Sequence, residues 1–216
     1  MTKDEKGYIQ FSCDWEQVEA IEYRRLPEMI RWRRILFVEG LVGVDAQGVG
    51  YGNISERLGA AGSFVITATQ TGHLEELDAS HFAIVTACDV PGNSISCVGA
   101  IRASSESLSH AILYRADAQV GAVIHVHDAE SWERLHGSVP TTDPSAEAGT
   151  VAMAQEIDRL MQSTDLRRRR ILVMGGHRDG LVAFGRSIAE AGSVILRACA
   201  RKAAVDRLVS PAIDNE

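Results

Sequence analysis

Two histidines one residue apart, His125 and His127, follow a short apolar run near the middle of the chain. The run, residues 122–124, is of the kind that forms a buried strand. Because side chains alternate along a strand, both imidazoles are expected on one face of it, with Val126 on the other. Imidazole pairs of this kind occur in metal sites, although His-x-His also recurs by chance. The pair therefore predicts part of a metal site, with two unrelated hydrogen-bonded histidines as the alternative.

A third ligand must come from elsewhere, because catalytic zinc sites typically use three protein ligands and keep one position open. His177 is the best candidate. It follows an apolar strand pattern at residues 171–174 and two glycines, which allow the backbone to approach another element closely. Three neutral imidazoles leave the ion its full charge, which suits the stabilisation of an anion.

A carboxylate, Glu106, stands with Ser104 and Ser105 at the start of a predicted helix that leads to the histidine strand. Beside an ion, a carboxylate can carry a carbon-bound proton, and hydroxyls together with free N–H groups at a helix start can hold an anion. The alternative is a first-turn acid that the helix dipole favours. His110, one turn further on, is expected to be a core or supporting histidine rather than a ligand.

The elements that must position these residues follow from hydrophobic periodicity and turn signals. Residues 43–52 contain four glycines and are predicted to form a loop, and Ser187 is expected to cap the last helix. Helices on a mixed or antiparallel sheet are the expected architecture. Helices are predicted at residues 14–39 with a break at Pro27, and at 104–115, 129–136, 146–161 and 187–208. Strands are predicted at residues 53–58, 63–67, 82–90, 94–98, 122–127, 171–174 and 181–184.

Length, charge and cysteine spacing indicate the domain organisation of the protein and exclude some classes of partner. The 216 residues suit one domain, expected over residues 1–216, and the net charge of -7 argues against nucleic acid or an anionic membrane as the main partner. No run reaches the length of a membrane helix, and the N-terminus is polar without an apolar signal core. The four cysteines are scattered without a C-x-x-C pattern, so they are expected to be reduced, in a cytoplasmic protein.

Several short motifs follow one another along the chain. They are Asn53-Ile-Ser55 after a glycine, Ile66-Thr67 with Thr71-Gly72, Ser104-Ser105-Glu106 with His110 and Tyr114, His125-Val-His127, Ala148-Gly149-Thr150 with Met153-Ala154, and His177 with Phe184-Gly185. Each motif is weak alone, but their order and spacing resemble the class II aldolase/adducin family, including its fuculose-phosphate aldolase and ribulose-phosphate epimerase members. The resemblance covers residues from about 27 to about 208.

The resemblance implies a three-layer α/β/α single domain with a central, mainly antiparallel sheet. It also implies a divalent metal, usually Zn²⁺, on His125, His127 and His177, and a homotetramer with the active site between subunits. Glu106 would be the catalytic acid/base of this site. The residues that the resemblance assigns to substrate binding are Asn53, Thr71, Gly72, Ser104 and Ser105.

The function that these expectations favour is a metal-dependent carbon–carbon lyase of the aldolase type. It would act on a small sugar phosphate or related carbonyl compound through an enediolate. No tyrosine follows His127, although aldolase members use tyrosines as a second acid, and the loop of residues 67–72 contains no lysine or arginine. A non-phosphorylated hydroxy- or keto-acid is therefore a second substrate class. The alternatives are a dehydratase or epimerase on the same metal site, with Glu147 as its acid/base, and a non-catalytic adducin-like scaffold.

Overall fold

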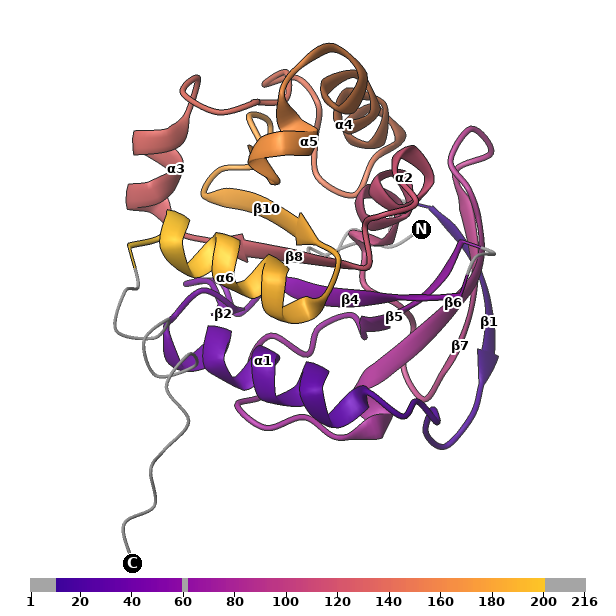
Figure 1. Cartoon of the computed structure of the whole chain (residues 1–216). Helices are drawn as coiled ribbons and strands as arrows, with labels where there is room; N and C mark the ends of the chain where they lie inside the picture. Colours follow the sequence, from indigo (N-terminus) through magenta and orange to yellow (C-terminus); the bar gives the residue numbers. More distant parts are fainter. Residues whose placement is uncertain (1–10, 60–61, 201–216) are drawn as a thin grey trace, which may run out of the picture.

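Eight strands form one mixed sheet across the molecule, and helices cover both of its faces (Figure 1). The computed structural model describes residues 11–59 and 62–200. The strands are β1 (Ser12–Gln17), β2 (Gly43–Val44), β3 (Gly50–Tyr51), β4 (Asn53–Leu58), β5 (Ser63–Thr67), β6 (Phe82–Asp89), β7 (Ser94–Gly99), β8 (Ala122–His127), β9 (Ile171–Val173) and β10 (Gly180–Gly185). The helices are α1 (Leu26–Val38), α2 (Ser107–Ala116), α3 (Ala129–Leu135), α4 (Val151–Ser163), α5 (Leu166–Arg169) and α6 (Ile188–Ala198), with one 3-10 turn at Ala79–His81.

The sheet has the strand order β1-β7-β6-β5-β4-β8-β10-β9, and β2 pairs with β3 in a separate ribbon. Within the described ranges, the β1–β7 pair is parallel and the remaining pairs are antiparallel. The expected α/β class and mainly antiparallel sheet are thereby confirmed. None of the helices in the described part of the chain is long and apolar enough to cross a membrane.

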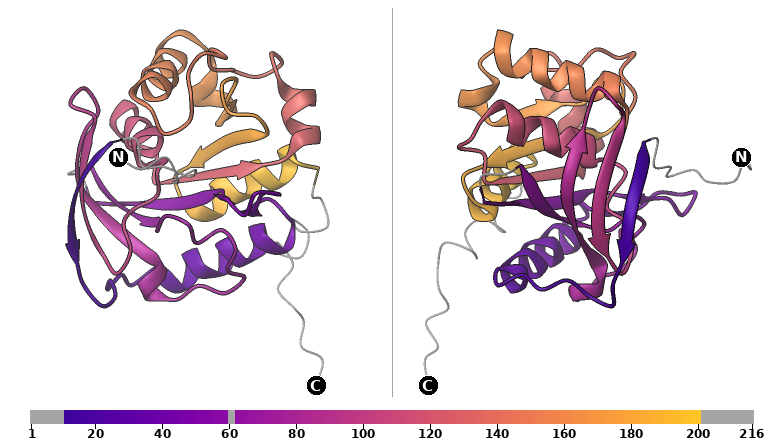
Figure 2. Two further views of the ribbon diagram at one scale, coloured as in Figure 1. Left: turned by 180° about the vertical axis from the view of Figure 1, so that it is seen from behind. Right: turned by 90° about the vertical axis from the view of Figure 1, so that its right-hand side faces the viewer.

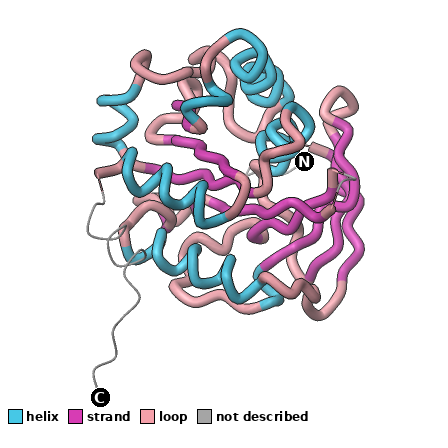
Figure 3. Tube along the Cα trace, in the orientation of Figure 1, coloured by secondary structure: helices cyan, strands magenta, loops and turns pink. Residues whose placement is uncertain are grey.

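Two hydrophobic cores lie on opposite faces of the sheet, between the strands and the two sets of helices (Figures 2 and 3). One core joins the strands to α1 and α6, and the other joins them to α2 and α4. Helix α1 buries Met29, Trp32 and Leu36, which lie three or four residues apart and so share one helical face. Along β8, Ile124 enters the α1–α6 core and Val123 enters the other, because alternate side chains of a strand point to opposite faces.

The first predicted helix is wrong at its N-terminal part. Residues 12–17 form the edge strand β1, which pairs with β7, instead of a helix from residue 14. Cys13 and Trp15 are half-buried and the residues beside them are exposed, so burial alternates along this strand. The ring N–H of Trp15 also donates to the carbonyl of Gly99 at 2.9 Å. Helix α1 itself begins where proline was expected to start it, with Pro27 in its first turn.

Other predicted boundaries also differ from the structure, and helix α2 starts at Ser107 rather than Ser104. Helix α4 starts at Val151 rather than Ala146, because Thr150 is its N-cap and accepts from the N–H of Met153 at 3.2 Å. The glycine-rich stretch 43–52 contains the short β2–β3 ribbon. Ser187 caps α6 as predicted, and the helix ends at Ala198. The predicted continuation over residues 201–208 lies outside the described residues.

Candidate active site

Three histidine side chains meet at one end of the sheet. His125 and His127 lie on β8, and His177 lies in the turn between β9 and β10. Their candidate ligand atoms all lie within 4.8 Å of one another, and the Nε2 atoms of His127 and His177 are 2.9 Å apart. The structure thus brings together the three residues that the sequence suggested as ligands.

The ring of His125 is fixed by the neighbouring strand. Its Nδ1–H donates to the backbone carbonyl of Leu181 on β10 at 3.1 Å, which leaves the Nε2 lone pair free. On the other side, His125 pairs with Asn53 in the β4–β8 ladder, so the two side chains lie next to each other on one face. Strand pairing therefore sets both the position and the tautomer of this imidazole.

The turn that carries His177 needs its two glycines. A Cβ on Gly175 would lie 2.2 Å from the carbonyl oxygen of Thr142, and a Cβ on Gly176 would lie 2.0 Å from that of Ala146. The N–H of Gly175 also donates to the hydroxyl of Thr142 at 2.9 Å. The turn is thus pressed against the segment of residues 142–146.

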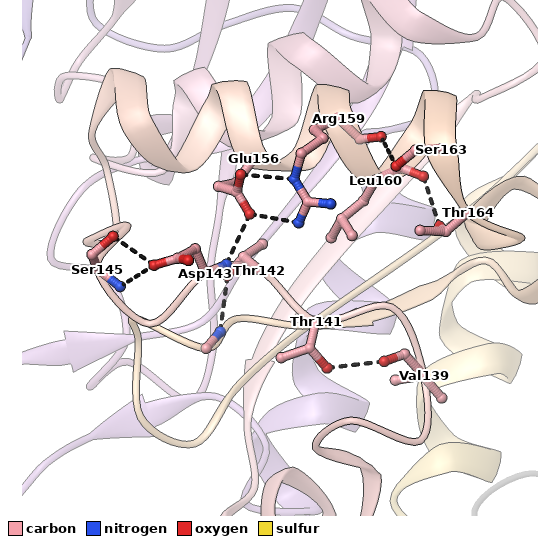
Figure 4. Close-up of polar contacts among 11 residues, drawn as sticks. Val139, Thr141, Thr142, Asp143, Ser145, Glu156, Arg159, Leu160, Ser163 and Thr164 are labelled. Atoms are coloured by element: carbon pink, nitrogen blue, oxygen red, sulfur yellow. Dashed lines mark hydrogen bonds and ion pairs between the residues drawn. The ribbon is translucent and has the colours of Figure 1, made fainter.

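That segment is in turn anchored to helix α4 (Figure 4). The N–H of Asp143 donates to Glu156 at 2.9 Å, and Arg159 donates to both oxygens of the same carboxylate. The Asp143 carboxylate accepts from the N–H and the hydroxyl of Ser145. A chain of polar contacts thereby runs from α4 to the His177 turn.

Burial keeps all three imidazoles neutral. Desolvation lowers the pKa of His127 to about 3 and the pKa of His177 to about 4. Desolvation, together with the neighbouring histidines, lowers the pKa of His125 well below its ordinary value. Three uncharged ring nitrogens at this spacing fit a divalent transition ion, because only unprotonated imidazole offers a lone pair.

Glu106 lies at the N-cap of α2 and is only 7% exposed. Burial raises the pKa of its carboxyl to about 7, although hydrogen bonds from Ser109 and from the backbone of Gly149 pull that pKa down. The Ser109 hydroxyl donates to Oε2 at 3.2 Å. A carboxyl that titrates near neutral pH can both take up and return a proton.

One pocket of about 780 Å³ is lined by all nine predicted site residues. Asn53 is buried, and its Oδ1 has no hydrogen-bond partner among the described residues. The Thr71 hydroxyl donates to the carbonyl of Ala68 at 2.9 Å, which commits its proton to the loop. The Ser104 hydroxyl accepts from the N–H of Glu106 at 3.3 Å.

Tyr51 is a pocket residue that the sequence did not single out. Its ring stacks on His127, with centroids 4.8 Å apart and planes 23° from parallel. The signal that could have found it is an aromatic residue between two glycines, Gly50 and Gly52, directly before Asn53.

Two residues that the sequence analysis considered, Glu147 and His110, do not line the pocket. Glu147 is exposed and is not among the residues that line it. His110 is fully buried, as its core assignment predicted; its Nδ1 lies 2.6 Å from the Ser55 hydroxyl, which lies 2.7 Å from that of Tyr114.

Comparison with known protein families shows to which family this chain belongs. Residues 28–198 match the model of the "Class II Aldolase and Adducin N-terminal domain". The chain belongs to the class II aldolase and adducin family. Class II aldolases are generally dependent on divalent metals, and the histidine cluster of this member agrees with that dependence. No match was found among curated proteins.

Solved structures of this family share the fold. YgbL from Escherichia coli is 20% identical in sequence to this chain, and the two structures superpose with a TM-score of 0.59. The alignment covers 88% of this chain and 91% of the YgbL chain. The L-fuculose-1-phosphate aldolase from Thermus thermophilus is 19% identical with a TM-score of 0.59, covering 87% and 97%. A sugar-phosphate aldolase from Thermotoga maritima is 17% identical with a TM-score of 0.58, covering 87% and 98%.

Proposed function

We propose that this protein is a metal-dependent carbon–carbon lyase of the aldolase type, acting on a small sugar phosphate or related carbonyl compound through an enediolate. The observation that carries the proposal is the neutral cluster of His125, His127 and His177 in the same pocket as Glu106. Membership of the class II aldolase and adducin family supports it.

The three histidines would hold one divalent ion, and we propose Zn²⁺, which imidazole ligands suit. Such an ion supplies Lewis-acid stabilisation to negative charge that develops on substrate oxygens. The Tyr51 ring covers one face of His127 and so holds that imidazole in orientation and keeps water from it.

Glu106 is assigned the transfer of the carbon-bound proton. Its pKa of about 7 makes the carboxylate a stronger base than an exposed glutamate, while its acid form remains accessible at neutral pH. A well-placed general base typically contributes ~10²–10⁴-fold to the rate. The Ser109 hydroxyl, which donates to Oε2, orients the carboxylate.

The anionic end of the substrate is assigned to the polar, uncharged groups that line the same pocket. Ser104 and Ser105 precede α2, whose first-turn N–H groups attract negative charge. Asn53, Thr71 and Gly72 also line the pocket. Hydroxyl, amide and backbone N–H groups can donate hydrogen bonds to a phosphate or a carboxylate.

Aldol-type cleavage is favoured over dehydration by the position of Glu147. That carboxylate is exposed and lies outside the pocket lining, so within one subunit it does not reach the reacting atoms. An epimerase would use the same pocket and the same Glu106. A non-catalytic scaffold is disfavoured because all three histidines and Glu106 are retained and converge.

The test is a substrate screen of the zinc- and manganese-loaded protein with phosphorylated and unphosphorylated ketoses, aldoses and keto-acids. Proton NMR in D₂O would follow both C–H exchange and carbon–carbon cleavage. We expect release of a shorter aldehyde, followed by uptake of deuterium at the carbon of the other product from which the bond was broken. Formation of an epimer without release of an aldehyde would assign an epimerase instead. A purified protein that binds no divalent ion would overturn the lyase and the epimerase together.

We further propose that the protein is a cytoplasmic homotetramer whose active site lies between subunits. Light scattering coupled to gel filtration should give four times the mass of the 23.4 kDa chain. A monomeric mass with full activity would contradict this assembly.

A further inference from the structure

Two cysteine side chains meet at one edge of the sheet. Cys13 on β1 is partly exposed, Cys97 on β7 is 2% exposed, and neither is in a disulfide. Their Sγ atoms are 3.5 Å apart. In the parallel β1–β7 ladder Cys97 lies opposite Trp15, so Cys13 stands two residues before the paired position and on the same face of β1. Neither cysteine lines the pocket, and together they form a dithiol pair outside the candidate active site.

A hydrogen bond between the two sulfurs makes them unequal. The Cys13 thiol donates to Cys97, which lowers the pKa of Cys97 to about 7 although burial raises it. The backbone N–H of Ala103 and the guanidinium of Arg102 lower the same pKa further. The bond between the sulfurs raises the pKa of Cys13 above its ordinary value. At neutral pH the pair therefore holds a thiolate, the form of cysteine that reacts with oxidants, beside a thiol.

Cys88, on the adjoining strand β6, offers a comparison within the same sheet. It is also partly exposed, but its sulfur has no sulfur partner in the described part of the chain. Burial raises the pKa of its thiol to about 11, so Cys88 remains protonated at neutral pH. The difference between Cys97 and Cys88 follows from their neighbours.

Strand β1 is the element that can move to close a bond between the sulfurs. A disulfide holds its sulfurs about 2.05 Å apart, so the two atoms must approach each other by about 1.5 Å. The offset of two residues in the ladder also requires β1 to shift along β7. Because β1 is the last strand at one end of the sheet, it pairs along one side only (Figure 1). An edge strand with one partner opens more readily than the central strands.

One contact of Cys97 lies next to the pocket. Ala103, whose N–H donates to the Cys97 sulfur, directly precedes Ser104, and Ser104 lines the pocket. Ala103 also forms an antiparallel bridge with Ala68, another pocket residue. Oxidation of Cys97 removes the negative charge that its sulfur offers to this N–H. The backbone beside the pocket then loses a charge-assisted hydrogen bond.

Trp15 provides a second link from β1 to the same stretch of chain. Its ring N–H donates to the carbonyl of Gly99 at 2.9 Å, and the Cζ of Arg102 lies 5.2 Å from the centre of its ring. A shift of β1 therefore also acts on residues 99–103, which lead into the pocket.

We propose that Cys13 and Cys97 are a redox modification site, at which hydrogen peroxide converts the dithiol into a disulfide that displaces β1 and the backbone of Ala103. The Cys97 thiolate attacks one peroxide oxygen and becomes a sulfenic acid, while the other oxygen leaves as hydroxide and takes a proton from solvent. The Cys13 sulfur then attacks the sulfenic sulfur and loses its proton, and the hydroxyl group leaves with that proton as water. The two sulfurs lose two electrons, and one peroxide is reduced to two waters. The inference is independent of the proposed function, because the pair would oxidise whatever reaction the pocket catalyses.

The test treats the full-length wild type with hydrogen peroxide at pH 7. Alkylation of the remaining thiols over time, followed by peptide mass mapping without reduction, measures each cysteine separately. We expect a Cys13–Cys97 cross-linked peptide that dithiothreitol removes, and loss of the Cys97 thiol at least about tenfold faster than loss of the Cys88 thiol. A pair that stays reduced while Cys88 is oxidised would overturn the proposal, as would oxidised Cys97 without a cross-link.

Two variants distinguish the roles of the sulfurs. Cys13→Ser keeps a hydrogen-bond donor but removes the second sulfur, so dimedone should trap a sulfenic acid on Cys97, and absence of this adduct would contradict Cys97 as the attacked sulfur. Cys88→Ser is the matched control and should form the disulfide as fast as the wild type does.

The coupling to the pocket is measured on the wild type, so it does not depend on the folding of a variant. The amide resonances of Ala103 and Glu106 in ¹⁵N NMR spectra should differ between the reduced and the fully cross-linked protein. Unchanged resonances would show that the disulfide does not displace the backbone beside the pocket, and that part of the proposal would be wrong.

Discussion

Strand β8 presents two different surfaces to the two halves of the molecule. Ile124 and Val126 enter the α1–α6 core, where they pack among aliphatic side chains. His125 and His127 face the opposite side, where buried polar groups gather around a pocket. The same six-residue strand thus contributes apolar packing on one face and desolvated imidazoles on the other. The apolar face stabilises the fold. This packing offsets the free-energy cost of burying titratable groups with shifted pKa values on the other face.

The largest expected effect is on the polar face. His127→Ala should abolish stoichiometric zinc binding and all metal-dependent activity, because it removes one of the three histidines that we propose as ligands. Elemental analysis after dialysis measures the loss. His136→Ala, which changes an exposed histidine, is the control and should bind zinc as the wild type does. Full zinc occupancy in His127→Ala would remove this residue from the ligand set.

Glu106→Gln should lower turnover by ~10²–10⁴-fold with zinc still bound, since it removes the group that we propose as proton carrier and leaves the imidazoles intact. Steady-state kinetics on the substrate from the screen would measure it. Glu147→Gln is the matched control, because Glu147 is exposed and lies outside the pocket. A loss in Glu147→Gln as large as that in Glu106→Gln would favour the dehydratase over the lyase.

On the apolar face the expected effect is on stability alone. Gly192 of α6 lies against α1, and a Cβ there would be 2.1 Å from the ring of Trp32. Gly192→Ala should therefore destabilise the protein by about 1–3 kcal/mol through overpacking, with zinc content unchanged. Urea unfolding measures the change. Combining it with Trp32→Leu should recover part of the loss, and additive losses would show that the clash is not the cause.

The smallest effect concerns pH. Burial lowers the pKa of His110 to about 3 from an ordinary 6.5, so the unfolded chain binds a proton that the folded chain does not as pH falls below 6.5. Stability should therefore fall on acidification by up to ~1.4 kcal/mol per pH unit from this group. In zinc-loaded His110→Gln the difference in unfolding free energy between pH 7 and pH 5 should shrink. An unchanged difference would mean that His110 titrates normally.

The predictable part of the site was the part encoded locally. The His-x-His pair needed only the alternation of a strand, and Glu106 needed only a helix start, so their positions follow from a few adjacent residues. The roles given to these residues stay predictions until metal and substrate are tested. The β6–β7 hairpin and the Ser187 cap were also readable from turn and cap residues.

The unpredicted parts depend on contacts between distant segments. Strand β1 exists through its parallel pairing with β7, which is remote in sequence, and its alternation is too short to overrule helix-forming glutamates. Arg33 and Arg34 are adjacent and chemically identical, yet only Arg33 is buried. Which of them is buried is set by the face that α1 turns to the sheet. The role of Tyr51 could not be predicted for a similar reason, since the ring that it stacks on, His127, is distant in the sequence.

The separation of His127 and His177 has a consequence for the motions of the chain. The two residues are 50 positions apart, and the segment between them contains α3, α4, α5 and β9. An ion shared by both would act as a cross-link that closes this loop, and cross-links of such length reduce the entropy of the opened chain. Metal loading should therefore slow amide hydrogen exchange throughout the segment, well beyond the residues that touch the ion. The chemistry of the pocket and the local unfolding of a large part of the protein would then be governed by one equilibrium.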